Sequence, residues 1–377
     1  MKISLPMPPK PVGHPRATSR PLKASLVARE RVGSDDHSTY ARAQASLVLG
    51  TGPERPRARS EADGSLPPGW ATVPVTRCTS GRGYAVAAYQ SIGDRKTQED
   101  RFTLVPRLDP SLDIATSFFG VFDGTVGDFA SNTVKDLVVP KLLESPSWKA
   151  CRSSEEGQER LLVEAFQDMY RSADEALLAM CAKQSQHYAT CTSVTVLIMG
   201  DLLVVGHLGD SRVVLVKEEE SRPGVLVGEQ LTADHKPDLE AERRRIEQCG
   251  GMVERLHNHG NKPFIRGGDF TMRKALGEQP MQLQYSRAFG AKDLKIFGLS
   301  SAPDVRTIRM GSSPKVKCLI LASDGLWDVI STQEATRICQ EEPAHLAEAL
   351  VHAALREQAR FGGRADNITA VTVQFDQ

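Results

Sequence analysis

Short apolar runs that end on glycine or on charged residues dominate the chain from about Gly83 onward. Some of these runs alternate imperfectly between apolar and polar positions and others are unbroken, and both patterns are typical of partly or fully buried strands. The pattern predicts strands at "YAVAAY" (84–89), "TSFFGVF" (116–122), "TSVTVLIM" (192–199), "LLVVGHL" (202–208), "RVVLVK" (212–217), "CLILAS" (318–323) and "NITAVTVQF" (367–375).

Several segments between these runs place apolar residues at helical spacing. They predict helices at 128–143, 159–182, 236–251, 333–341 and 343–360. The connections 200–201 and 209–211 are short enough to form only hairpins, so the sheet that they join is antiparallel. Antiparallel groups of strands with helices between them predict an α+β fold, in which helices pack on the outer faces of stacked antiparallel sheets.

Residues 1–80 follow neither period and are rich in Pro, Arg, Lys and Ser, and their first acidic residue is Glu30. This composition predicts a disordered or loosely attached basic extension ahead of a globular domain at 81–377. The start "MKISLPMPP" has no apolar stretch long enough for a secretory signal, which favours a solvated tail over a targeting peptide. "RPRAR" (55–59) is a weak nuclear-import motif.

Charge and cysteine usage exclude several classes of protein. The 377 residues carry 47 Lys or Arg and 47 Asp or Glu, so net charge gives no signal for nucleic acid or an anionic membrane. No apolar run approaches the ~20 residues of a membrane-spanning helix. Scattered cysteines without a CxxC pair predict neither zinc binding nor disulfides, but a reducing cytoplasmic or nuclear compartment. They are Cys78, Cys151, Cys181, Cys191, Cys249, Cys318 and Cys339.

Carboxylates recur where the predicted strands begin or end. They are Glu99, Asp100, Asp123, Asp210, Asp324, Asp328 and Asp366. A single carboxylate at such a position is usually a cap or a turn former. Several together are costly to bury unless they are paired or bind metal, and carboxylates with backbone carbonyls suit Mg²⁺ or Mn²⁺. Two such ions about 4 Å apart can activate a water and hold a transferring phosphoryl group.

Motifs in a fixed order make the chain similar to the metal-dependent protein phosphatases of type 2C, the PPM family. They are "GDRKTQED", "FFGVFDG", "TSVTVLIMGDLLVVGHLGDSR", "LTADHKPDLEAERRRIEQCGG", "SRAFG", "LILASDGLWDVIS" and "DNIT". No single motif decides the resemblance, but together they span nearly all of 83–377. The resemblance implies a four-layer αββα sandwich with a binuclear metal site at one end of its two sheets.

The resemblance also implies an activity. It predicts a monomeric enzyme that hydrolyses phosphoserine and phosphothreonine in proteins, by in-line attack of a metal-bound water and without a phosphoenzyme. The cofactors would be two Mg²⁺ or Mn²⁺ ions, with a weaker third site seen in some members.

The resemblance implies a metal-binding role for four of these carboxylates and for one backbone carbonyl. Asp123 resembles the ligand that bridges both ions. The Gly124 carbonyl and Glu99 resemble the other protein ligands of the second ion. Asp324 and Asp366 resemble the remaining ligands of the first.

Four further residues take supporting roles from the same resemblance. Asp100 matches a residue that orients metal-bound waters, and Asp210 and Asp328 match the third site, which they share with Asp324. Arg95 matches the arginine that binds the substrate phosphate. A planar, permanently charged guanidinium suits a phosphate dianion better than a lysine would.

One departure from the family falls in the active-site motif. The family usually has Asp-Gly-His-Gly-Gly where this chain has Asp123-Gly124-Thr125-Val126-Gly127. The family's histidine is held to protonate the leaving alkoxide, and a threonine hydroxyl is no comparable acid near neutral pH. Turnover of phosphoserine and phosphothreonine is therefore expected to be slowed, and that of aryl phosphates less so. His235 is the nearest substitute among the motifs, although a structural role for it is favoured.

Two other regions depart from the family pattern. Ala291 stands where the family usually has Asp, and Asp293 could compensate for it. Residues 252–285 are expected to form a variable flap beside the site. This flap is basic, which fits either a solvated loop or a surface that prefers acidic or phosphorylated protein segments. Its charged residues include Arg255, Lys262, Arg266, Arg273 and Lys274, against Asp269.

Three functions remain open from the sequence. The complete ligand set favours an active protein serine/threonine phosphatase. Thr125 and Ala291 favour instead a pseudophosphatase that binds phosphoproteins without turning them over. The third alternative is a metal-dependent hydrolase of the same fold that acts on a small phosphorylated molecule.

Overall fold

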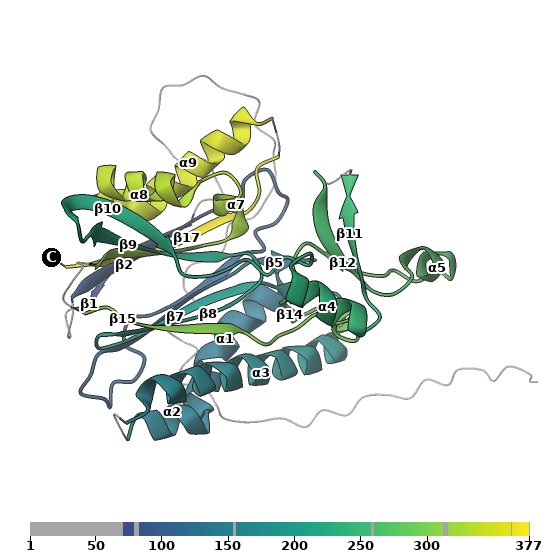
Figure 1. The fold of residues 1–377 in the computed structure, drawn as a ribbon, viewed down its shortest axis with the longest axis horizontal. Helices are drawn as coiled ribbons and strands as arrows, with labels where there is room; N and C mark the ends of the chain where they lie inside the picture. The colour runs from purple at the N-terminus through teal and green to yellow at the C-terminus, as the bar shows by residue number, and fades with distance from the viewer. Residues whose placement is uncertain are drawn as a thin grey trace, which may run out of the picture. The chain divides into compact units, whose positions relative to one another are not determined.

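The computed structural model describes residues 71–78, 83–153, 156–257, 260–311, 316–362 and 364–376, with the side chains of 71–78 excepted. These residues belong to one compact unit, Ser65–Gln377. Two antiparallel sheets stack on each other within it, and helices cover both outer faces (Figure 1). The predicted extension up to residue 70, with its import motif, lies outside the described residues.

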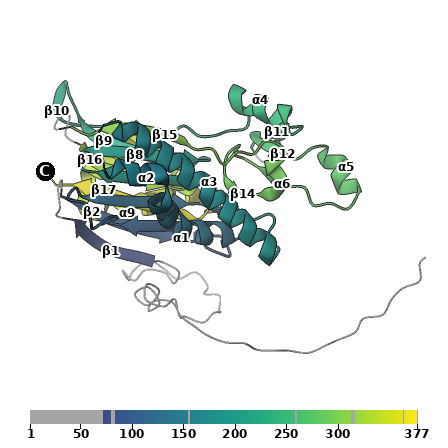
Figure 2. The same cartoon turned by 90° about the horizontal axis from the view of Figure 1, so that it is seen from below.

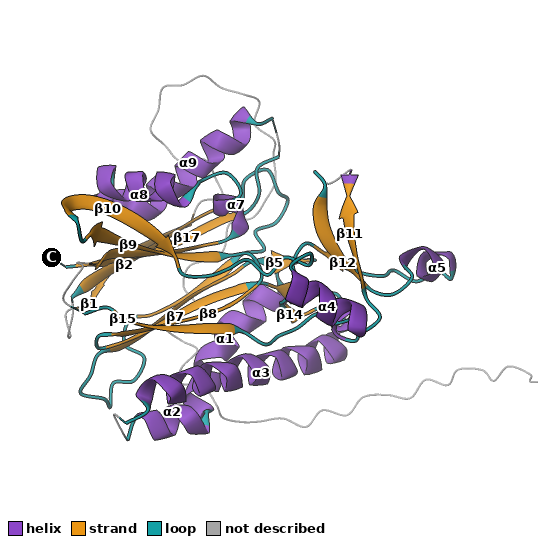
Figure 3. Cartoon of the chain, viewed as in Figure 1, coloured by secondary structure: helices purple, strands orange, loops and turns teal. Residues whose placement is uncertain are grey.

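The two sheets contain every strand that the apolar runs predict. The six-stranded sheet has the order β1 (Ala71–Cys78), β2 (Tyr84–Ser91), β17 (Ile368–Phe375), β16 (Val316–Ala322), β9 (Arg212–Glu219), β10 (Arg222–Gln230). The five-stranded sheet has the order β15 (Asp304–Arg309), β8 (Leu202–Leu208), β7 (Ser193–Met199), β4 (Thr116–Phe122), β3 (Arg101–Val105). All neighbouring strands in both sheets are antiparallel (Figure 3).

Helices complete the four layers. Helices α1 (Phe129–Glu144), α2 (Pro146–Cys151) and α3 (Gln158–Gln184) cover the five-stranded sheet (Figure 2). Helices α8 (Thr332–Glu341) and α9 (Leu346–Arg360), joined by the short η2 (Pro343–His345), cover the other sheet. Apolar side chains from both sheets fill the space between them, so a central strand such as β4 is buried at every position. The predicted α+β sandwich of two antiparallel sheets flanked by helices is confirmed.

Four strands that the sequence pattern missed lie at the sheet edges. β1 and β10 are the edges of one sheet, and β3 and β15 are the edges of the other. An edge strand has a neighbour on one side only and tolerates polar residues, which weakens the apolar pattern. β1 also lies inside the segment that composition assigned to the extension, so strand structure already begins at Ala71. The predicted helix 236–251 is shorter than expected, because α4 covers only Glu240–Gln248.

Smaller elements stand at one end of the sandwich. The predicted flap contains the sheet β11 (Met252–Leu256), β12 (Lys262–Arg266), β13 (Gln282–Leu283) and the helix α5 (Phe270–Ala275) (Figures 1 and 2). A second small sheet consists of β5 (Gly124–Thr125), β6 (Thr190–Cys191) and β14 (Phe289–Gly290). Two one-turn helices, α6 (Lys292–Lys295) and α7 (Asp324–Trp327), complete this end.

Two other expectations concern cysteines and membranes. The six cysteines with described side chains are all free thiols, and five of them are buried, as expected for small core residues. Cys249 is the exposed one. Within the described ranges, no helix has both the length and the apolar character that crossing a bilayer requires.

Candidate metal centre and active site

Most of the predicted site residues meet in one open cleft with a volume of about 830 Å³, whereas Asp100 and Asp328 are not among the described residues that line it. Strand ends and the loops beside them bring these residues together from positions far apart in the sequence. Those that line the cleft are Arg95, Glu99, Asp123, Gly124, Thr125, Asp210, Asp324 and Asp366. Phe264 and the segment Gln282–Tyr285 close it from the flap side.

The central carboxylates are held by the rigid sandwich. Asp123 directly follows β4, Asp324 follows β16 at the start of α7, and Asp366 precedes β17. Desolvation raises the pKa of Asp123 and of Asp324 well above the usual value, and neighbouring carboxylates raise both further. Such a cluster of like charges is stabilised by cations that bind between them.

The donor set fits divalent metal ions. It consists of carboxylates together with the Gly124 backbone, the hard oxygen ligands that Mg²⁺ and Mn²⁺ prefer. Asp100 Oδ1 and Asp210 Oδ1 are buried and have no hydrogen-bond partner among the described residues. Buried oxygens without a hydrogen-bond partner are well placed to bind a metal ion or a water molecule that the ion holds.

Close packing also explains the glycine of the motif. A Cβ atom on Gly124 would lie 2.5 Å from the Glu99 carbonyl oxygen and 2.8 Å from Ser131 Oγ. Any larger residue would push β5 away from the Glu99 backbone. Gly124 therefore keeps two predicted ligand positions adjacent.

Glu99 and Asp100 are fixed by hydrogen bonds. Glu99 Oε2 accepts from the Gly127 amide at 3.0 Å. Asp100 Oδ2 accepts from Ser323 Oγ at 2.8 Å and from Thr369 Oγ1 at 2.7 Å. Burial raises the pKa of Asp100 to about 6. Because one Asp100 oxygen is held and the other is unpartnered, its geometry suits the predicted role of orienting waters.

The predicted third metal site already contains cationic side chains. Lys236 Nζ lies 2.5 Å from Asp210 Oδ2, and Lys262 Nζ lies 2.8 Å from Asp328 Oδ2. Lys262 belongs to flap strand β12, so this ion pair ties the flap to the sandwich. A third cation would have to compete with these two ammonium groups.

Arg95 lies at the rim of the cleft. Its Nη2 is 2.6 Å from Asp366 Oδ2, and more than half of its side chain (56%) is exposed. Lys96 and Arg364 also line the cleft, and sequence reasoning missed both. Arg364 could have been noticed in "GRADN", because it lies two residues from a predicted metal ligand.

No histidine replaces the family's missing one among the described residues that line the cleft. Thr125 instead meets Tyr285, whose hydroxyl donates a hydrogen bond to Thr125 Oγ1 at 2.9 Å. Sequence reasoning missed Tyr285, because an isolated tyrosine in a variable segment carries no signal of its own.

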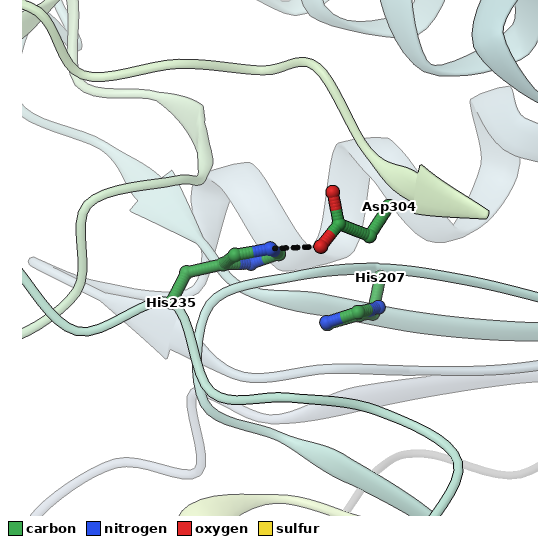
Figure 4. Close-up of side chains that lie close together, drawn as sticks. All are labelled: His207, His235 and Asp304. Carbon is green, nitrogen blue, oxygen red and sulfur yellow. Dashed lines mark hydrogen bonds and ion pairs between the residues drawn. The ribbon is translucent and has the colours of Figure 1, made fainter. Parts of the chain in front are cut away.

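His235 lies in a separate cluster with His207 and Asp304 (Figure 4). His235 Nδ1 accepts from the Gly209 amide at 3.1 Å, and its Nε2 faces Asp304 Oδ2 at 3.3 Å. His207 stacks on it and directs Nε2 to the Ala233 carbonyl at 2.9 Å. Burial lowers the pKa of His207 to about 4. Hydrogen bonds and stacking account for these contacts of the two rings, which supports the structural role predicted for His235.

The basic residues of the flap are largely neutralised. Arg255 pairs with Asp238, Arg266 with Glu254, and Arg273 with Asp293 and Glu278. Lys262 pairs with Asp328, as described above, and Lys274 lies over the Phe270 ring. This pairing favours a solvated flap over a positively charged docking surface.

Ala291 and Asp293 do not restore a carboxylate to the cleft. Ala291 is buried at a positive φ of 50° and packs in an apolar cluster. Asp293 Oδ1 lies 2.7 Å from Arg273 Nη2, and Oδ2 accepts from the Met281 amide at 3.1 Å. Asp293 therefore holds the flap, and neither residue is among the described residues that line the cleft.

The raised carboxylate pKa values predict how metal stabilisation depends on pH. A carboxyl group with a higher pKa in the folded protein stabilises it below about pH 4, and this stability is lost as pH rises through the folded-state pKa. For Asp100 that loss spans about pH 4 to 6. The gain in melting temperature on adding Mn²⁺ in place of EDTA is therefore expected to grow between pH 5 and 7, by on the order of 5 °C.

Differential scanning calorimetry of matched samples measures this gain. Groups outside the cluster, such as His207, titrate in both samples and cancel in the difference. A gain that is constant from pH 5 to 7 would show that the carboxylates have ordinary pKa values.

Comparisons with known proteins agree with the fold. The family described as "Protein phosphatase 2C" matches residues 84–368. "Probable protein phosphatase 2C 69" of Arabidopsis thaliana is 33% identical over 295 residues, which cover 78% of this chain and 69% of the relative.

Solved structures give the same result. A serine-threonine phosphatase 2C from Toxoplasma gondii is 50% identical with a TM-score of 0.75, and the match covers 82% of this chain and 100% of the other. A sex determining protein of C. elegans, at 24% identity and a TM-score of 0.60, shares the fold. The match to the family over most of the chain confirms the resemblance, and the chain belongs to the protein phosphatase 2C family, a family of metal-dependent protein serine/threonine phosphatases.

Proposed function

We propose that the chain is an active phosphatase that hydrolyses phosphoserine and phosphothreonine in proteins with two Mg²⁺ or Mn²⁺ ions. The observation that carries this proposal is the cluster of carboxylates with raised pKa values in an open cleft whose rim carries Arg95. Asp123 would hold both ions. The Gly124 carbonyl and Glu99 would complete one site, and Asp324 and Asp366 the other.

The side chains around these ligands would divide the remaining work. Bound divalent cations supply an activated water and neutralise the charge of the phosphoryl group. Arg95 would leave its ion pair with Asp366 to bind the phosphate oxygens through its guanidinium. Asp100 would accept a hydrogen bond from an incoming water through its unpartnered oxygen.

The pseudophosphatase is the second candidate, and Thr125 is the observation that favours it. Ala291 carries less weight than the sequence suggested, because it is buried in an apolar cluster away from the cleft lining. Every residue of the proposed ligand set lines the cleft, which a binding scaffold would not require.

Incubation with a phosphothreonine peptide and with small phosphate esters, in the presence of Mn²⁺, separates the candidates. Phosphate release from the peptide supports the proposal. Peptide binding without release indicates the scaffold. Release from small esters alone indicates a small-molecule hydrolase.

Replacing Arg95 by Lys is expected to lower kcat/KM for a phosphothreonine peptide about tenfold, because lysine cannot form the bidentate contact. Steady-state kinetics measures this change. Arg107→Lys is the matched control, since Arg107 is exposed and does not line the cleft. Unchanged kinetics in Arg95→Lys would exclude Arg95 from phosphate binding.

A further inference from the structure

Tyr285 carries a buried hydroxyl group that the proposed reaction has not yet used. Its side chain is only 6% exposed, and its ring packs in the apolar cluster that also contains Ile265 and Leu283. Its hydroxyl reaches the cleft and donates to Thr125 Oγ1 at 2.9 Å. The phenol therefore holds the residue that stands in place of the family's histidine.

We propose that Tyr285 is a positioning residue that makes Thr125 the proton donor to the leaving group. The inference rests on the proposed function and adds a residue to it. Because the phenol O–H occupies one lone pair of Thr125 Oγ1, the threonine hydroxyl proton is free to point away from Tyr285 and into the cleft. Thr125 is thereby oriented toward the oxygen of a departing serine or threonine.

The protons balance in this arrangement. As the ester P–O bond breaks, its electron pair stays on the leaving oxygen, and that oxygen takes the hydroxyl proton of Thr125. The phenol proton of Tyr285 moves onto Thr125 Oγ1 at the same time. Solvent in the open cleft then returns a proton to Tyr285, and both hydroxyl groups are restored.

The surroundings of Tyr285 keep its hydroxyl protonated between turnovers. Burial raises the pKa of the phenol well above its usual value of 10, and the nearby Asp123 and Asp210 raise it further. The hydroxyl is therefore a hydrogen-bond donor throughout the neutral range.

Both departures from the family involve Tyr285 or its cluster. Thr125 accepts the hydrogen bond, and Ala291 belongs to the apolar cluster that surrounds Tyr285. A carboxylate at position 291 would be desolvated in that cluster. An alanine there is compatible with the packing that holds the phenol in place.

Leaving-group dependence tests the inference, because p-nitrophenolate leaves without protonation whereas a threonine alkoxide does not. Tyr285→Phe removes only the hydroxyl. It is expected to lower kcat for a phosphothreonine peptide about 10- to 100-fold and to change kcat for p-nitrophenyl phosphate less than about twofold. Thr125→Val should show the same selective loss, and the double variant no further loss.

Tyr170→Phe is the matched control, because it removes a buried hydroxyl that bonds Ser193 and Thr195 in the opposite core. It should leave the ratio between the two substrates unchanged. An equal loss on both substrates in Tyr285→Phe, or additive losses in the double variant, would overturn the inference and leave the phosphatase intact. If Tyr285→Phe fails to fold, Thr125→Val decides in the same way. A wild-type protein inactive on both substrates would instead overturn the proposed function.

Discussion

Replacing Asp123 by Asn is expected to lower kcat on the order of 10³-fold or more with every phosphate ester tested. Asp123 is the one carboxylate expected to hold both metal ions, and Asn offers a neutral oxygen in its place. The neighbours Asp100, Asp210, Asp324 and Asp366 remain, but the charge that would bring two cations together is reduced. Steady-state kinetics with saturating Mn²⁺ measures the loss.

The same variant should have the opposite effect on the ion-free protein. Asp123 lies in a desolvated cluster of like charges, which raises its pKa. A neutral Asn removes that repulsion, so the melting temperature in EDTA at pH 7 is expected to rise on the order of 5 °C. Asp201→Asn is the matched control, because Asp201 is exposed in the turn between β7 and β8. A loss of activity together with a lower melting temperature in EDTA would indicate damage to the fold instead.

Restoring the family's histidine gives the second large effect. Thr125→His is expected to raise kcat for a phosphothreonine peptide about 10²-fold, because an imidazolium can protonate the leaving alkoxide directly. The effect on p-nitrophenyl phosphate should be small, since that leaving group departs unprotonated. The cleft has room for the ring, because Thr125 lines its open volume and the neighbouring Val126 is exposed.

A comparison of the two substrates in wild-type and Thr125→His measures this effect. Thr125→Ser controls for disturbance of β5, because it changes the side chain at the same position and keeps the hydroxyl. Equal changes on both substrates would show that leaving-group protonation does not limit turnover in this chain.

The sequence pattern predicted the interior of the fold better than its edges. Central strands such as β4 and β7 are buried on both faces, so their apolar runs are unbroken. β15 is an edge strand with exposed charged residues, and its pattern contains no comparable signal. The helix α4 was predicted too long, because residues 236–239 form a turn before it, in which the Leu239 amide donates to the Lys236 carbonyl.

In the candidate site, too, some residues could be predicted from the sequence and others could not. Asp123, Asp324 and Asp366 could be predicted because each adjoins a buried strand, where an unpaired carboxylate has to be explained. Tyr285 and Lys262 could not, because their roles depend on how the flap packs against the sandwich. Contacts between segments more than a hundred residues apart, such as Tyr285 with Thr125, have no local signature in the sequence.

Phosphate release from a phosphothreonine peptide, measured in Mn²⁺, in Mg²⁺ and in EDTA, tests the central claim most directly. The account predicts release with either metal and none in EDTA, and release that Asp123→Asn abolishes. An absence of release in all three conditions, with Mn²⁺ binding shown by calorimetry on the same sample, would contradict it and identify a metal-stabilised phosphoprotein-binding scaffold.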